Sequence, residues 1–350
     1  MTKLEPQPTQ RHLGTHMRAT MGLTAALAAL LGVAALGAAQ AADPVTIRLS
    51  YVVPVSDLPS LLLEKKDLAK HLDKSYRLEV TRFAGTPPMI NALAAGELDI
   101  ADLAYPTLPV AIQNAGLSDL QVIADGFQDG PRYSNEFMVL TDGPVKKIED
   151  MNGKVVASNA IGSGVDIAMR SMLHKHGLQD KRDYTVIEAP FPTMRAILAE
   201  KKADLVSAVL PFALDPQLRG TARPLFTSKD AVGISEFTMW TARKDFIAKN
   251  RAALVDFMED ALTILRWYLD PSNHEAAVDI FARVSKQPRE RLDWAYTEKD
   301  YFRDRNLMPD LVALQRNVDL TRDLGFIKAS FDVAKQSDLS LVQEAAKRLK

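Results

Sequence analysis

Two stretches of this chain share one pattern: Met89-Ile-Asn-Ala-Leu-Ala-Ala-Gly-Glu-Leu-Asp-Ile-Ala-Asp-Leu103 and Met194-Arg-Ala-Ile-Leu-Ala-Glu-Lys-Lys-Ala-Asp-Leu-Val-Ser-Ala208. In both, a Leu-Ala pair begins four residues after the methionine, and an aspartate, Asp99 or Asp204, follows it by ten. Proline precedes each copy, as is common at a helix start. The spacing predicts a short amphipathic helix, a polar turn and a buried strand. The chain therefore carries one α/β unit twice, which predicts two similar lobes with a ligand-binding cleft between them.

The N-terminal region has the pattern of a secretory signal peptide. Residues 21–38 form an uncharged, Ala/Leu-rich run that follows Arg11 and Arg18 and ends in Ala39-Gln40-Ala41, a small-x-small cleavage pattern. The run is shorter than the ~20 residues of a spanning helix, so an uncleaved anchor is disfavoured. We therefore predict a signal peptide over residues 1–41, translated from Met1 or from Met17, and a periplasmic protein.

Composition narrows the class of protein. The sequence has 43 basic and 44 acidic residues, and removal of residues 1–41 takes away three basic residues and one acidic residue, leaving a formal charge of −3. This balance gives no electrostatic footprint for nucleic acid or for an anionic membrane. Cysteine is absent, which excludes disulfides, thiol nucleophiles and cysteine-ligated metals.

The pattern around both copies alternates strands with helices, which is typical of α/β lobes. We predict a first lobe over residues 42–139, a second lobe over 140–237, and a return to the first lobe with C-terminal helices over 238–350. Short apolar segments at 137–141 and 237–241 are interpreted as the two crossing strands, with a hinge between the lobes. Further elements are expected as strands at 45–52, 77–83, 120–124, 154–158, 184–188 and 222–227, and as helices at 59–72, 106–115, 253–269 and 333–349.

The most informative turn is Asn159-Ala-Ile-Gly-Ser-Gly-Val-Asp166, between a predicted strand and a predicted helix. Ser163 followed by Asp166 is a helix-cap signal, and the cap alone explains the serine. The functional alternative adds the N–H groups of Ser163, Gly164 and Val165, which would point out of the helix end and favour an anion. We expect this end to face the cleft.

Turns of the first lobe are expected to face the cleft from the side opposite the turn at 159–166. Ser56 and Thr86 follow the first two strands and can donate or accept hydrogen bonds, although such residues are also ordinary turn and cap residues. Tyr105 and Phe212 lie just past the equivalent strands of the two repeat copies. If both faced the cleft, a flat or apolar ligand body could lie between them.

The sequence gives little sign of catalysis or of metal binding. His174 and His176 are two residues apart, which does not place two imidazoles on one helix face, so we predict no metal site. No Ser/His/Asp set or carboxylate pair can be assembled, so we expect neither an enzyme nor a cofactor. Aromatic residues of the C-terminal region, among them Trp294 and Tyr301, are interpreted as core.

Several segments together resemble the NMT1/THI5-like family, the sulfonate-, taurine- and nitrate-type periplasmic solute-binding proteins that serve ABC importers. The segments are Phe83-Ala-Gly-Thr-Pro-Pro-Met89 with the first repeat copy, Met151-Asn-Gly-Lys-Val-Val-Ala157 with Gly162-Ser-Gly164, and Trp240-Thr-Ala-Arg-Lys-Asp-Phe246. The resemblance implies a type 2 periplasmic-binding fold: two Rossmann-like lobes that close on a small molecule and present it to a membrane permease.

The resemblance also implies which residues line the site: Val53, Pro54, Ser56, Gly85, Thr86, Tyr105, Gly162, Ser163, Gly164, Pro211 and Phe212. Ala104-Tyr105 and Leu210-Pro-Phe212 stand where related proteins carry more polar turns, which favours a bulkier aliphatic or aromatic sulfonate or carboxylate over taurine or nitrate. The expected protein is a monomer that delivers this small organic anion to its permease. Two alternatives stay open: binding or synthesis of a thiamin pyrimidine precursor, for which the family's cysteine-rich motif is missing here, and presentation of the ligand to a sensor.

Overall fold

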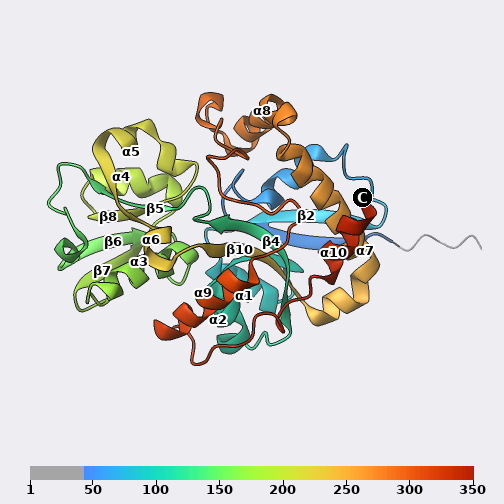
Figure 1. Cartoon of the computed structure of the whole chain (residues 1–350), viewed down its shortest axis with the longest axis horizontal. Coiled ribbons are helices and arrows are strands. Elements are labelled where there is room, and N and C mark those ends of the chain that lie inside the picture. The colour runs from blue at the N-terminus through green and yellow to red at the C-terminus, as the bar shows by residue number, and fades with distance from the viewer. Residues whose placement is uncertain (1–42) are drawn as a thin grey trace, which may run out of the picture. The chain divides into compact units, whose positions relative to one another are not determined.

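The computed structural model describes residues 43–350, so the predicted signal peptide lies outside the described residues. Two five-stranded sheets define two lobes (Figure 1). Lobe 1 has the strand order β2-β1-β3-β10-β4, and lobe 2 has the equivalent order β7-β6-β8-β5-β9. The strands are β1 (Val45–Tyr51), β2 (Tyr76–Arg82), β3 (Ile100–Ala104), β4 (Leu120–Asp129), β5 (Glu136–Leu140), β6 (Lys154–Ser158), β7 (Tyr184–Glu188), β8 (Leu205–Ala208), β9 (Ala222–Thr227) and β10 (Ser235–Arg243).

Both sheets are parallel except for one internal strand. β10 is antiparallel to β3 and β4, and β5 is antiparallel to β8 and β9. The helices are α1 (Pro87–Ala94), α2 (Thr107–Asn114), α3 (Gly164–Lys175), α4 (Met194–Ala199), α5 (Pro216–Thr221), α6 (Ser228–Val232), α7 (Lys244–Tyr268), α8 (His274–Ser285), α9 (Leu311–Asp323) and α10 (Ser340–Arg348). None of the helices in residues 43–350 combines the length and the apolarity of a membrane span.

The repeated unit forms as predicted. Helix α1 leads to β3, and α4 leads to β8, with Met89 and Met194 buried in equivalent positions. Asp99 exchanges two hydrogen bonds with the backbone of Arg48: its N–H donates to the carbonyl (2.9 Å), and its Oδ2 accepts from the N–H (2.9 Å). Asp204 makes the same exchange with Val155, at 2.7 and 3.0 Å. The aspartate of the repeat therefore fixes the strand that follows it to a neighbouring parallel strand, which is β1 in lobe 1 and β6 in lobe 2.

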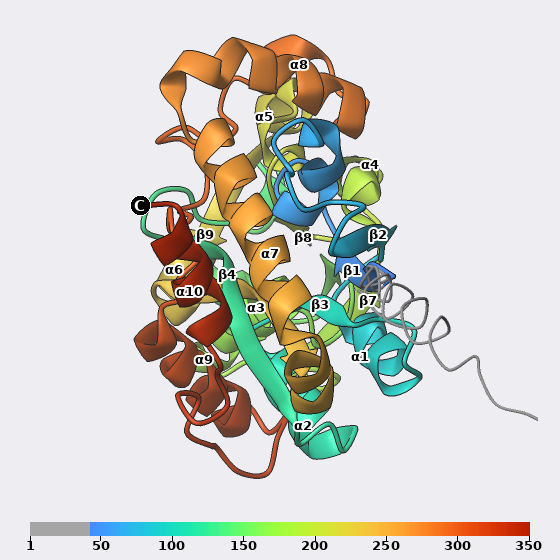
Figure 2. The same ribbon diagram turned by 90° about the vertical axis from the view of Figure 1, so that its right-hand side faces the viewer.

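The connections between the two sheets run through residues 130–135 and 228–234. β4 leads into the first connection, and β10 follows the second. Both segments expected as crossing strands instead belong to one sheet each: residues 137–140 lie in β5 of lobe 2, and residues 237–241 lie in β10 of lobe 1. The long helix α7 packs against lobe 1, and α10 lies beside it (Figure 2).

The expected helices at 59–72 and 333–349 are shorter than predicted. The first is a 3₁₀ helix over Leu58–Lys65, and the second is α10 alone. The C-terminal region is irregular because its backbone pairs with the edge strand β4: Gln128 bridges Phe302, Asp125 N–H donates to the Leu307 carbonyl, and Val122 bridges Ser337. Because a helix would use these backbone groups internally, it could not cover the edge of the sheet.

Candidate functional site

A cavity lies between the lobes, at the carboxyl ends of the parallel strands of both sheets. This is where open α/β sheets generally bind ligands. Lobe 1 contributes the turn after β1, the start of α1, the end of β3, and residues of β4 and β10; lobe 2 contributes the turns after β6, β7 and β8. The lining residues are Val52, Val53, Ser56, Asp57, Thr86, Ala104, Phe127, Phe237, Thr238 and Tyr301 from lobe 1, and Asn159, Ser163, Gly164, Val165, Phe191, Val209 and Leu210 from lobe 2.

The lobes are closed in this structure. The cavity measures about 40 Å³, far below the ~300–1,000 Å³ of typical small-molecule sites. Within residues 43–350, four neutral hydrogen bonds cross between the lobes: Ser56 Oγ to the Leu210 carbonyl (3.0 Å), Leu210 N–H to Tyr301 Oη (3.2 Å), Tyr105 Oη to the Gly164 carbonyl (3.0 Å), and Asn159 Nδ2 to the Ala84 carbonyl (3.2 Å). An organic solute therefore has to enter while the lobes are further apart.

Two glycines permit this close approach. A Cβ atom on Gly164 would lie 2.8 Å from the Phe237 ring, and one on Gly85 would lie 2.9 Å from Ala160 Cβ. In each pair the two residues come from opposite lobes. A side chain at either glycine would therefore clash as the lobes close.

The helix end at Ser163 has the predicted cap. Ser163 Oγ accepts from Asp166 N–H (3.4 Å), and Asp166 Oδ2 accepts from Gly162 N–H (2.8 Å). The prediction of a free N–H at Ser163 is wrong, because this group donates to the Ala160 carbonyl (3.1 Å) in the turn before the helix. Gly164 and Val165 are left as the N–H donors at this helix end that line the cavity.

Five of the predicted site residues meet at the cavity: Val53, Ser56, Thr86, Ser163 and Gly164. Pro54, Gly85 and Gly162 lie in the same turns but do not line it. Tyr105 and Phe212 do not face a common cavity, so a ligand body cannot lie between them as predicted. Tyr105 is fully buried, with its hydroxyl bound to Gly164, while Phe212 stacks on Phe191 and lines a separate hollow together with Pro211.

Sequence reasoning missed the residues that reach the cavity from distant parts of the chain. Phe237 and Thr238 come from β10, and Tyr301 comes from the C-terminal segment. The Tyr301 ring stacks on Phe127 at a centroid distance of 4.2 Å, so the residue belongs to the core, as expected, and to the cavity wall as well. Its position depends on the pairing of the C-terminal segment with β4, which no local pattern reveals.

One carboxyl side chain, Asp57, is among the residues that line the cavity. Its Oδ2 accepts from the N–H groups of Val52 and Val53, both at 2.8 Å, and so holds the turn after β1. Burial raises the pKa of Asp57 to about 6, although these two donors and the nearby Arg303 oppose the shift.

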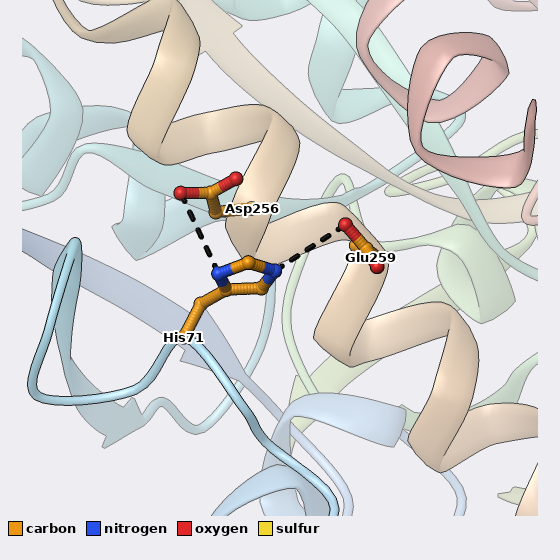
Figure 3. Close-up of side chains that lie close together, drawn as sticks. All are labelled: His71, Asp256 and Glu259. Carbon is orange, nitrogen blue, oxygen red and sulfur yellow. Dashed lines mark hydrogen bonds and ion pairs between the residues drawn. The ribbon is translucent and has the colours of Figure 1, made fainter. Parts of the chain in front are cut away.

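A second group of titratable residues lies apart from the cavity lining. Figure 3 shows His71 between Asp256 and Glu259 of α7, with Nδ1–Oδ2 and Nε2–Oε2 distances of 3.7 and 3.3 Å. Arg348 binds Asp256 at 2.8 Å, and Lys70 contacts Glu259. The two nitrogens of the imidazole face different carboxylates, and each carboxylate has a cationic partner. This group is therefore an ion-pair cluster that ties the loop before β2 to α7.

Comparisons with known proteins agree with this architecture. Residues 40–282 match the model of the NMT1-like family. The alkanesulfonate-binding protein SsuA from Xanthomonas axonopodis pv. citri, bound to MOPS, has a similar structure, with a TM-score of 0.67, 19% identity, and 85% of this chain and 100% of that chain covered. The periplasmic nitrate-binding protein NrtA from Synechocystis PCC 6803 has a TM-score of 0.67 and 17% identity, over 88% and 89% of the two chains.

An enzyme has the same fold. The desulfurization enzyme DSZB has a TM-score of 0.63 and 15% identity, over 87% of this chain and 100% of that chain. No curated protein matches in sequence. The family match covers more than half of the chain, and the two sheets with the cavity between them reproduce the architecture of the periplasmic binding proteins. The chain therefore belongs to the NMT1-like family and has the two-lobed α/β fold of the periplasmic ligand-binding components of ABC importers.

Proposed function

We propose that the protein is the solute-binding component of an ABC importer, exported through residues 1–41, and that it captures a small organic anion between its lobes. The observation that carries the proposal is the enclosed cavity, around which turns of opposite lobes are joined by hydrogen bonds. Such an arrangement suits a protein that alternates between an open and a closed form. Closure would hide the solute, and the closed monomer would deliver it to a permease.

The helix end at Gly164 and Val165 supports an acid group on the solute. Helix α3 has 12 residues, and its dipole favours negative charge at this end. The rest of the wall is largely apolar, with Phe127, Phe191 and Phe237 among its members. An aliphatic or aromatic carboxylate or sulfonate combines these two features. Two proteins of similar structure are named for small anions, because one binds an alkanesulfonate and the other binds nitrate.

We further propose that the protein has no catalytic activity. Ser56 and Ser163 are the serines of the cavity wall, and Ser56 Oγ is already bound to a carbonyl. Among the lining residues there is no histidine, lysine or cysteine to activate a hydroxyl. This composition favours binding over the chemistry that the name of DSZB indicates for that enzyme.

A thermal-shift screen of the purified protein tests the proposal. Aliphatic and aromatic carboxylates and sulfonates are compared with their uncharged primary amides, which have nearly the same shape. A bound acid at a concentration of 100 Kd should stabilise the protein by ~2.7 kcal/mol, whereas the matched amide should not. The proposal is contradicted if a folded sample responds to no small acid, or responds equally to acids and amides.

A further inference from the structure

Two hydroxyl groups in the cavity wall have no partner. Thr86 and Thr238 are 5% and 6% exposed, and both line the cavity. The Oγ1 atom of each is buried and makes no hydrogen bond with any residue of 43–350. Thr86 occupies the cap position of α1 but does not cap the helix. Because buried polar groups are normally paired, these two hydroxyls are available to a molecule in the cavity.

The charge of the wall is negative on the side of Thr238. Asp57 lines the cavity, and its Oδ1 accepts no hydrogen bond from the described residues. Lysine, arginine and histidine are absent from the lining residues. This side of the cavity thus offers a carboxylate and hydroxyl oxygens but no cation.

More carboxyl groups lie behind the wall. A Cβ on Gly126 would lie 2.2 Å from Thr238 Oγ1 and 2.9 Å from Asp102 Oδ1, so these two oxygens are neighbours, and Asp102 Oδ1 has no partner either. Asp125 and Glu236 are buried nearby. Burial and, to a smaller extent, neighbouring carboxyl groups raise the pKa values of these three residues, and Arg303 opposes the shift at Asp102 and Asp125.

Two cations, Arg303 and Arg82, act on Asp57, and both are already engaged. Arg82 donates through Nε to the Val52 carbonyl at 3.1 Å. Arg303 is buried, pairs with Asp300 at 2.8 Å, and donates through Nη2 to the Ser56 carbonyl. Arg303 lowers the pKa of Asp57 but is not among the residues that line the cavity. The carboxyl groups around Asp57 therefore outnumber the positive charges that could balance them.

We infer that the solute carries a protonated amine in addition to its acid group, and that the amine binds Asp57 and the Thr238 hydroxyl. The inference rests on the proposed solute-binding function and names its ligand class: a zwitterion with a short apolar body. The acid group occupies the end of α3 in lobe 2, and the ammonium group occupies the Asp57 side in lobe 1. Each lobe then holds one end of the solute, so binding is complete only when the lobes close.

Calorimetric titration with matched probes tests this inference. Each set contains a zwitterion, an acid without the amine and an amine without the acid. The aliphatic set is 5-aminopentanoate, pentanoate and pentylamine, and the aromatic set is 4-(aminomethyl)benzoate, 4-methylbenzoate and benzylamine. We expect the zwitterion of at least one set to bind tenfold or more tightly than its acid-only and amine-only partners. Asp57→Asn should remove the advantage of the zwitterion over the acid, because an amide keeps an oxygen for the Val52 and Val53 N–H groups but loses the charge. Thr238→Val should reduce that advantage. Asp119→Asn should preserve it, because Asp119 is half-buried, pairs with Arg243 and does not line the cavity.

The outcomes separate this inference from the function on which it rests. If the acid-only partner binds the wild type as tightly as the zwitterion does, the ammonium site is refuted and solute binding stands. If the preference for the zwitterion survives in a folded Asp57→Asn protein, the assignment to Asp57 is refuted. If no probe in either set binds, the inference is overturned; if, in addition, no acid stabilises the protein in the thermal-shift screen, the proposed function fails as well.

Discussion

The substitution Gly164→Ala should hinder the closure of the two lobes without destabilising lobe 2. Gly164 is the first residue of α3 in lobe 2, and its carbonyl accepts from Tyr105 of lobe 1. An added Cβ would lie 2.8 and 3.0 Å from two atoms of the Phe237 ring, and 3.4 Å from Ala104 Cβ. All of these neighbours belong to lobe 1. The new methyl group therefore meets no obstacle until the lobes come together.

The size of the effect follows from this geometry. Carbon atoms pack at ~3.5–4.0 Å, so the closed form must open by several tenths of an ångström or move the ring. The ring of Phe237 is held between Phe127, at a centroid distance of 5.3 Å, and Tyr105, at 6.1 Å. Overpacking of this kind costs about 1–3 kcal/mol, which corresponds to a roughly 5- to 150-fold smaller ratio of closed to open molecules. Alanine favours a helix more than glycine does, so lobe 2 itself should lose no stability.

Distance measurements between spin labels test this prediction. The chain has no cysteine, so Glu79→Cys and Lys202→Cys supply one labelling site in each lobe. In Gly164→Ala the distance distribution should shift toward the open form, while the unfolding midpoint stays the same or rises. Gly220→Ala is the matched control, because a Cβ at this glycine in a helix of lobe 2 meets no atom within 4 Å. A Gly164→Ala protein that closes as fully as the wild type would refute the reasoning.

Two further predictions concern stability. Asp99→Ala should destabilise the protein by ~2 kcal/mol and Asp204→Ala by ~1 kcal/mol. The effect at Asp99 is larger because this residue also pairs with the Arg48 guanidinium at 2.7 Å. Urea unfolding should rank the two variants in that order. The wild type should lose stability as pH rises from about 4 to about 7. Burial raises the pKa of Asp129 to about 7 in the folded protein. A group with a raised folded-state pKa stabilises the fold only while it holds its proton. In Asp129→Asn the amide can donate to Ser134 and accept from Asn135, so its urea midpoint should fall less over this range; an unchanged pH slope would contradict the assignment to Asp129.

The sequence allowed the repeated unit and the cap at Ser163 to be predicted because both depend on neighbours within a few residues. Asp99 and Asp204 stand at the same position of the two copies and make the same pair of backbone hydrogen bonds. Residues such as Tyr301 could not be placed, because its hydroxyl meets Leu210, 91 positions away. The C-terminal region was expected to be helical for a related reason: apolar spacing does not reveal that its backbone pairs with the edge strand β4.

The energetics of closure explain why unpaired hydroxyls in the cavity wall matter for function. Each of the four hydrogen bonds between the lobes contributes about 0.5–1.5 kcal/mol net, because an open protein exchanges them for bonds to water. Closing the lobes on an empty cavity leaves the Thr86 and Thr238 hydroxyls without partners, at about 1–3 kcal/mol each. The two sums are similar in size, so the unpaired hydroxyls can offset what the four hydrogen bonds contribute to closure. A solute that satisfies both hydroxyls removes this penalty, and the removal gives it a differential affinity for the closed form, which drives closure.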